Sequence, residues 1–118
     1  MKWIVEPSTV SGTIQIPGSK SHTIRAVVIA SLAEGRSEIR HPLDSLDTRS
    51  AVSVCQALGA RITCSENCWN VEGTAGAPSV PDNVIDVGNS GTTLRTTLGM
   101  AALAEGYSVF TGDAQIRS

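Results

Sequence analysis

The sequence predicts an α+β fold built from repeated βαβαββ units, with one complete unit and one truncated unit in its 118 residues. Two observations predict this arrangement. Stretches with a one-sided apolar stripe, typical of helices, alternate with short runs typical of strands. The tetrapeptide Leu-Ala-Glu-Gly also ends two of the helical stretches, at 32–35 and at 103–106, which indicates an internal repeat.

The pattern divides the chain into three segments. Residues 1–16 are expected to contain two strands joined by a turn, at 2–6 and 12–16. Residues 17–83 form the complete unit, with helices expected at 20–33 and 46–58, a strand at 37–41, and a hairpin of strands 61–65 and 68–72. Residues 84–118 form the truncated unit, with a strand at 84–87, a helix at 91–104 and one further strand.

The truncated unit lacks the second helix and the hairpin that complete the first unit. A sheet without its covering helix exposes apolar surface and an unpaired strand edge. We therefore expect that residues 1–118 are not a complete folding unit. The simplest source of the missing elements is a second polypeptide that carries the rest of a larger enzyme.

Composition argues against several classes of partner. A net charge of −2 with no basic block gives no reason to expect nucleic acid. No run is long enough to span a membrane and the first residues lack a signal-peptide pattern, so we expect a soluble cytoplasmic protein. The three cysteines do not predict a disulfide framework, and Cys55 falls on the apolar face of a helix. Neither the cysteines nor the two histidines have the spacing of a metal site.

The stretch with the most chemistry is Pro-Gly-Ser-Lys-Ser-His-Thr-Ile-Arg-Ala, residues 17–26. Ser19 is a favourable N-cap, and Lys20 and Ser21 lie in the first turn, where free backbone N–H groups and the helix dipole favour an anion. Arg25 lies four residues after Ser21 and can share its face. The stretch predicts a site for a doubly anionic small molecule. A capped surface helix with two solvated cations explains the same pattern equally well.

A second stretch, Gly-Asn-Ser-Gly-Thr-Thr-Leu-Arg at 88–95, has the same design. Its small residues, including Gly91 beside Asn89, let a ligand approach the backbone, and its helix start offers free N–H groups. Arg95 lies one turn into the expected helix. A capped helix explains one such stretch, but two in a short chain favour an anion site.

Four stretches resemble, in the same order, signatures of the 5-enolpyruvylshikimate-3-phosphate (EPSP) synthase family: residues 17–26, 43–48, 88–95 and 112–117. The resemblance implies a two-domain fold of repeated βαβαββ units with the active site between the domains. This chain would cover the N-terminal quarter, with residues 1–16 in the other domain. The implied reaction moves the enolpyruvyl group of phosphoenolpyruvate to the 5-hydroxyl of shikimate 3-phosphate, in aromatic amino-acid biosynthesis, without a metal or organic cofactor.

The resemblance also implies roles for individual residues. Lys20 would contact phosphoenolpyruvate, lie close to shikimate 3-phosphate and act as the catalytic residue of this segment. Ser21 and Arg25 would hold the shikimate carboxylate, since arginine offers a planar fork to a carboxylate. Gly91 would give its backbone N–H to phosphoenolpyruvate, with Asn89 shaping the turn.

The chain departs from the family pattern at several positions. Leu46 replaces the first of two usual Asp residues, Thr96 replaces a usual Pro, and Gln115 replaces a usual Ser or Arg. The change at Thr96 puts in question the sensitivity to glyphosate, an inhibitor that resembles phosphoenolpyruvate. In the family the fourth stretch continues to a second Arg that binds phosphoenolpyruvate, and this Arg would come immediately after Ser118. No convincing carboxylate pair for acid/base work is present. We therefore expect half a binding site that is inactive alone.

Other interpretations stay open at this point. UDP-N-acetylglucosamine enolpyruvyl transferase shares the fold implied here, but its first stretch has Lys-Asn where this chain has Lys20 and Ser21. A non-catalytic phosphate-binding remnant would bind a phosphorylated ligand at micromolar concentration by itself, whereas half of a split enzyme would not. A plain interaction domain would leave the two cationic helix starts unexplained.

Overall fold

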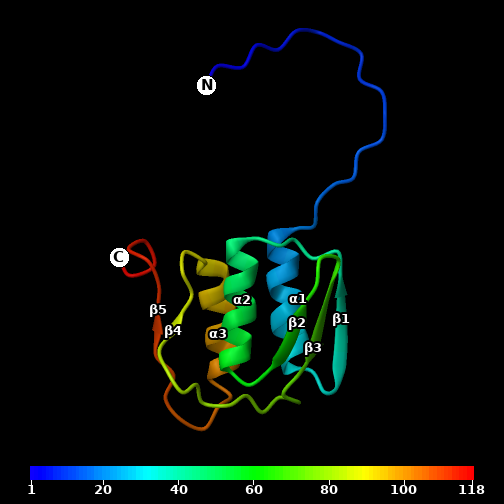
Figure 1. Cartoon of the computed structure of the whole chain (residues 1–118). Coiled ribbons are helices and arrows are strands. Elements are labelled where there is room, and N and C mark those ends of the chain that lie inside the picture. Colours follow the sequence, from blue (N-terminus) through cyan, green and yellow to red (C-terminus); the bar gives the residue numbers. More distant parts are fainter.

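Three helices pack against one another in the computed structural model, which describes residues 1–118, and the first two of them also cover one face of a three-stranded sheet (Figure 1). A second sheet has two strands. In chain order the elements are α1 (Lys20–Leu32), β1 (Arg36–Arg40), α2 (Leu46–Ala57), β2 (Arg61–Cys64), β3 (Cys68–Glu72), β4 (Ile85–Asp86), α3 (Gly91–Ala101) and β5 (Phe110–Thr111). The fold mixes helices and strands, as the sequence predicts.

Each helix begins after a serine that caps it. The hydroxyl oxygens of Ser19, Ser45 and Ser90 each accept a hydrogen bond from the backbone N–H three residues later. At α2 the hydroxyl of Thr48 also accepts from the backbone N–H of Ser45 at 2.9 Å, which completes a capping box. The expected helix starts are confirmed. They could be predicted from the sequence because a capping signal acts within a few residues. The helix expected to reach residue 104 ends at Ala101, where i→i+3 bonds replace the helical ones.

The main sheet has β3 at its centre, antiparallel to both β1 and β2. Trp69 of β3 pairs with Ile39 of β1 and with Cys64 of β2, and it is fully buried. The expected hairpin of residues 61–65 and 68–72 is thus confirmed. In the second sheet β4 and β5 pair in parallel, with α3 between them in the chain.

The core lies between the helices and the inner face of the main sheet. It consists of fourteen buried residues: Ile24, Val27, Val28, Ala51, Val52, Val54, Cys55, Leu58, Ala60, Trp69, Ile85, Val87, Met100 and Ala101. Cys55 is fully buried, as its position on the helix predicts, and burial raises the pKa of its thiol to about 11. The Arg49 guanidinium lies over the ring of Trp69, 5.4 Å from its centroid, and pairs with Asp44.

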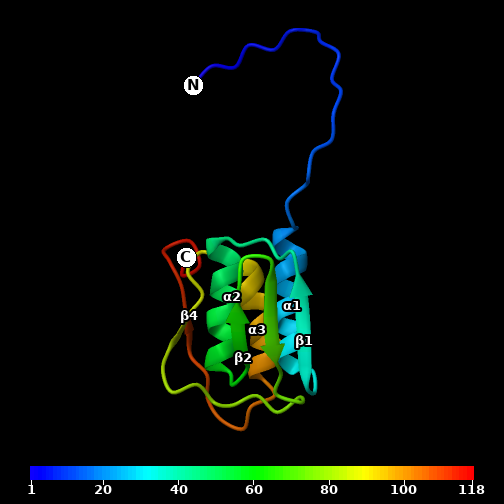
Figure 2. The ribbon, with the colours of Figure 1, turned by 45° about the vertical axis from the view of Figure 1, so that its right-hand side comes forward.

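No strand forms at 2–6 or 12–16 in this chain, and the placement of these strands in the other domain stays a prediction. Residues 1–17 run as an extended segment away from the body (Figures 1 and 2). Their apolar side chains, such as Trp3 at 81% and Ile14 at 80% exposure, have no sheet to cover. A strand forms only when its backbone groups find partners, and these residues pair with none. The segment explains a radius of gyration of 17.2 Å, against about 13.5 Å for a compact domain of this length.

The second unit follows the expectation only in part. The strand expected at 84–87 is reduced to the two residues of β4. Leu98, which the repeat matches to the buried Val28, is 46% exposed, so part of the apolar stripe of α3 lies uncovered. The division of the chain into units at 17–83 and 84–118 stays a prediction.

Gly73 follows β3 at a point where the loop crosses the end of α1. A Cβ at this position would clash with the carbonyl oxygen of Ala33 and lie 2.5 Å from that of Ala30. Both obstacles are backbone atoms, which cannot move aside without disturbing α1. Gly99, in the last turn of α3, has nothing within 4 Å of its would-be Cβ and serves as a matched control.

We expect Gly73→Ala to lower the free energy of unfolding by about 2 kcal/mol or more. Gly99→Ala should raise it by about 0.5–1 kcal/mol, because alanine is the better helix former. Urea unfolding followed by circular dichroism measures both. An unchanged midpoint for Gly73→Ala would show that the loop does not cross α1 as described.

Candidate functional site

The N-terminal ends of α1, α2 and α3 lie at the same edge of the body (Figures 1 and 2). A strand returns the chain to this edge before α2 and again before α3, so the three helices run in the same direction. Each helix start carries free backbone N–H groups and the positive end of a dipole. Three such ends at one edge favour a negative charge there more than one end alone.

Side chains tie the three helix starts together at Asp47. Lys20 Nζ of α1 donates to Asp47 Oδ2 at 2.5 Å. Thr93 Oγ1 of α3 donates to the backbone carbonyl of Asp47 at 3.4 Å. In addition, Ser50 Oγ of α2 donates to the carbonyl of Val87 at 2.8 Å, just before the second glycine-rich turn. The two stretches that the sequence singled out are therefore neighbours of the same turn of α2.

Lys20 is held at this edge but is not buried. Its side chain is 51% exposed, and that of Asp47 is 27% exposed. At this exposure the ion pair adds little to the free energy of unfolding. Its effect is orientation, because the carboxylate fixes the ammonium group of Lys20 beside the first turns of α1 and α2.

Ser21 and Arg25 share one face of α1, as their spacing predicts. Arg25 Nη1 donates to the backbone carbonyl of Ser21 at 3.4 Å. No carboxylate lies within 4.0 Å of the exposed Arg25 guanidinium, so its other donors are open to an anion. The role of both residues toward a ligand stays a prediction.

The second glycine-rich turn places Gly91 as the first residue of α3. Gly88 has a φ of +59°, a conformation that glycine adopts without strain. A Cβ on Gly91 would find only Ile116 Cδ1, at 3.9 Å. The chain therefore leaves the Cβ side of Gly91 open, and the role of its backbone N–H toward phosphoenolpyruvate stays a prediction.

Asn89 contacts residues that sequence analysis did not connect with it. Its side-chain Nδ2 donates to Asp113 Oδ2 and, at 2.9 Å, to Gln115 Oε1. Asp113 Oδ1 in turn accepts from the backbone N–H groups of Gln115 at 3.0 Å and Ile116 at 3.1 Å. An Asp that bonds to backbone two and three residues later is a recognisable local signal, but its contact with Asn89 is not.

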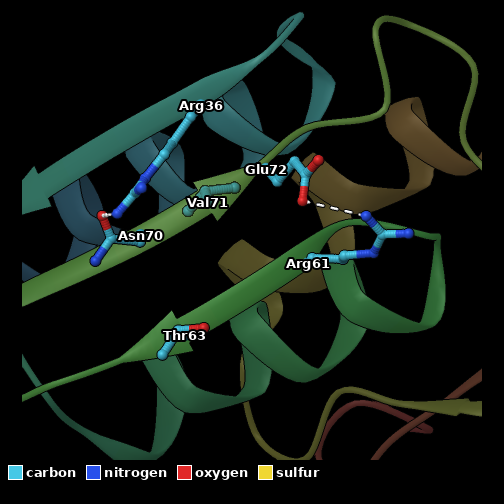
Figure 3. Close-up of a pocket in the computed structure, with 6 residues that line it drawn as sticks. All are labelled: Arg36, Arg61, Thr63, Asn70, Val71 and Glu72. Atoms are coloured by element: carbon cyan, nitrogen blue, oxygen red, sulfur yellow. Dashed lines mark hydrogen bonds and ion pairs between the residues drawn. The ribbon is translucent and has the colours of Figure 1, made fainter.

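The largest hollow of the surface lies elsewhere, on the outer face of the main sheet (Figure 3). It has a volume of about 410 Å³ and is lined by Arg36, Arg61, Thr63, Asn70, Val71 and Glu72. Its cations already have partners within the chain: Arg36 donates to Asn70 at 2.8 Å, and Arg61 pairs with Glu72 at 3.2 Å. This hollow is an open, polar sheet face without convergent groups, and we do not take it as the functional site.

Two kinds of feature are absent from the structure. No group of three or more His, Cys, Asp or Glu side chains is close enough together to hold a metal ion. None of the helices is both long and apolar enough to cross a membrane.

Comparisons with known proteins identify the family to which the chain is related. Residues 4–118 match the family described as EPSP synthase (3-phosphoshikimate 1-carboxyvinyltransferase). A 3-phosphoshikimate 1-carboxyvinyltransferase of Acetivibrio thermocellus is 61% identical over 113 residues, which cover 96% of this chain and 27% of the relative. That of Ruminiclostridium cellulolyticum is 56% identical with the same coverage. The solved EPSP synthase from Acinetobacter baumannii aligns with a TM-score of 0.81 at 28% identity, over 87% of this chain and 24% of its own.

These relatives are carboxyvinyl transferases by name, and that is the class of enzyme that the fold and the matches define. The chain belongs to the EPSP synthase family. It spans about a quarter of the length, 27%, of the curated relatives it matches. The resemblance of the four sequence stretches to this family is thereby confirmed.

The hydrogen bonds to Asp113 have a consequence for pH. Bonds from the backbone N–H of Ile116 and from the amide of Asn89 hold the pKa of this carboxyl below its usual range. A carboxyl with a lowered pKa in the folded state contributes stability above its unfolded pKa, about 3.9, and loses it as the pH falls through the folded value.

We therefore expect the turn at 112–118 to stay ordered from neutral pH down to the ordinary carboxyl range and to loosen only below it. Nuclear magnetic resonance of the Ile116 backbone amide during an acid titration reports this directly. If the Asp113 carboxyl titrates at or above the ordinary value, the hydrogen bonds described here do not exist in solution.

Proposed function

We propose that this chain forms one wall of the active site of an EPSP synthase. The reaction transfers the enolpyruvyl group of phosphoenolpyruvate to the 5-hydroxyl of shikimate 3-phosphate and releases phosphate. The observation that carries the proposal is the meeting of three helix starts at one edge, joined through Asp47, with Lys20 and Arg25 beside them. Both substrates are anions with a phosphate and a carboxylate, which suits such an edge.

The residues divide the recognition of the two substrates between them. Lys20, a movable point charge at the shared edge, contacts the phosphate of phosphoenolpyruvate and lies close to shikimate 3-phosphate. The hydroxyl of Ser21 and the planar fork of Arg25 hold the shikimate carboxylate. The backbone N–H of Gly91, at the start of α3, binds phosphoenolpyruvate.

The chemical step needs groups that these residues supply only in part. A proton is added to C3 of phosphoenolpyruvate while the 5-hydroxyl loses one and attacks C2. The tetrahedral intermediate then loses phosphate and returns the C3 proton. Cationic groups at the edge stabilise the charged intermediate, and Lys20 can relay a proton. The carboxylates for the acid/base work lie outside these residues.

A second polypeptide supplies the opposite wall in this proposal. The chain spans 27% of its relatives' length, and Lys20 and Arg25 are exposed rather than enclosed. Catalysis of this type needs a site from which water is excluded. A half-enzyme with an open edge would therefore be inactive and would bind a phosphorylated ligand weakly by itself.

The direct test joins residues 1–118 to the remaining part of the Acetivibrio thermocellus relative. We expect the joined enzyme to make EPSP from the two substrates. Lys20→Ala should lower its kcat/KM by about 100-fold or more, because a charge that stabilises the transition state is lost. Arg25→Ala should raise the KM for shikimate 3-phosphate by about tenfold or more, through loss of a bidentate carboxylate contact.

Arg36→Ala is the matched control, because it removes an exposed cation from the outer face of the main sheet. It should change kcat/KM by no more than about twofold. Full activity of the Lys20→Ala enzyme would refute the proposal. Activity with UDP-N-acetylglucosamine in place of shikimate 3-phosphate would favour the related transferase.

The isolated chain tests the need for a second polypeptide. We expect residues 1–118 to show no enolpyruvyl transfer alone, and activity to appear when the remaining part of the relative is added as a separate chain. A steady-state phosphate-release assay compares the two samples. Turnover by the isolated chain, or its binding of phosphoenolpyruvate at micromolar concentration, would contradict the split site.

A further inference from the structure

We propose that Asp113 is a positioning residue for the substrate-binding turn at 88–91, and that it acts through the side chain of Asn89. The inference rests on the proposed function, because it concerns the same site. Asp113 lies in the turn after β5, on a different part of the chain from the helix start that it holds. Asp113 belongs to the stretch at 112–117 that resembles a family signature, but the resemblance implies no role for it.

The Asn89 amide is held by two acceptors. Its Nδ2 donates to Asp113 Oδ2 and to Gln115 Oε1, so both of its N–H bonds are used. An ionised carboxylate can only accept, which fixes the nitrogen side of the amide toward Asp113. Gln115, which departs from the family pattern, is thus the second acceptor for Asn89.

The backbones of the same two segments also meet. The N–H of Asp113 donates to the carbonyl of Gly88 at 2.9 Å. A Cβ on Gly112 would lie only 2.7 Å from that carbonyl, so the glycine is required for the approach. The turn at 88–91 is therefore held at its backbone by Asp113 N–H and at its side chain by the Asp113 carboxylate.

The Asp113 carboxylate makes two sets of hydrogen bonds, one to Asn89 and one to the backbone of its own turn, and a test must separate their effects. Its Oδ1 orders its own turn by accepting from Gln115 and Ile116, while its Oδ2 holds Asn89. Asp113→Asn keeps an oxygen for the two backbone N–H groups but turns an amide nitrogen toward Asn89. Two amide nitrogens cannot form a hydrogen bond, because both are donors. The side-chain amide of Asn89 must therefore rotate or move away from residue 113. Asp113→Ala removes both sets of hydrogen bonds.

The enzyme joined to the Acetivibrio thermocellus relative provides the test. We expect Asp113→Asn to raise the KM for phosphoenolpyruvate by about tenfold and the KM for shikimate 3-phosphate by no more than about twofold. A general loss of structure would raise both. Asp82→Asn removes a carboxylate that makes no ion pair and is the matched control.

A double-mutant cycle with Asn89→Ala shows whether Asp113 acts through Asn89. If it does, Asp113→Asn adds no more than about twofold to the KM for phosphoenolpyruvate in the Asn89→Ala enzyme. Independent, multiplying effects would overturn the proposal. So would an Asp113→Asn enzyme that behaves like the Asp82→Asn control.

A measurement without catalysis separates this inference from the proposed function. In the 118-residue chain labelled with ¹⁵N-asparagine, the Asn89 side-chain amide resonances are identified by their loss in Asn89→Ala. Asp113→Asn should shift them, whereas Asp82→Asn should leave them in place. Unshifted resonances would overturn the role of Asp113 even in an active enzyme. An inactive joined enzyme with shifted resonances would refute the proposed function alone.

Discussion

The parallel packing of three helices whose first turns meet at one edge is the constraint on which the rest of the structure depends. Val27 of α1 and Thr97 of α3 are fully buried, so neither helix can rotate without exposing a core position. Asp47, at the start of α2, contacts both neighbouring helices. The proposed anion site is therefore largely a property of backbone packing, to which side chains such as Lys20 add direction and charge.

The packing of the helix starts distinguishes the proposed site from the hollow on the main sheet, which has the outward form of a binding pocket. The hollow on the outer face of the main sheet has a volume of about 410 Å³, but its arginines are already paired with neighbouring side chains (Figure 3). At the helix edge Arg25 has no carboxylate partner, and only Ile116 Cδ1 lies within 4 Å of a Cβ placed on Gly91. An edge that is open on one side calls for a partner wall, which is consistent with a chain that spans 27% of its relatives.

The sequence predicted the helix starts and the hairpin because their signals are local. A serine cap or a turn between two strand patterns acts within a few residues. At 2–6 and 12–16 the strand pattern is present but no pairing partner is, so these strands do not form in this chain. The contact of Asn89 with Asp113 could not be predicted from the sequence, because it depends on how two turns distant in the chain pack together. The same holds for the cation of Arg49 over Trp69.

The most direct test of the shared edge is a crystal structure of the joined enzyme with phosphoenolpyruvate and shikimate 3-phosphate bound. The account predicts that the phosphate of phosphoenolpyruvate contacts Lys20 Nζ and the backbone N–H of Gly91, and that the shikimate carboxylate contacts Ser21 and Arg25. Substrates bound away from the starts of α1 and α3, with these groups facing solvent, would contradict it.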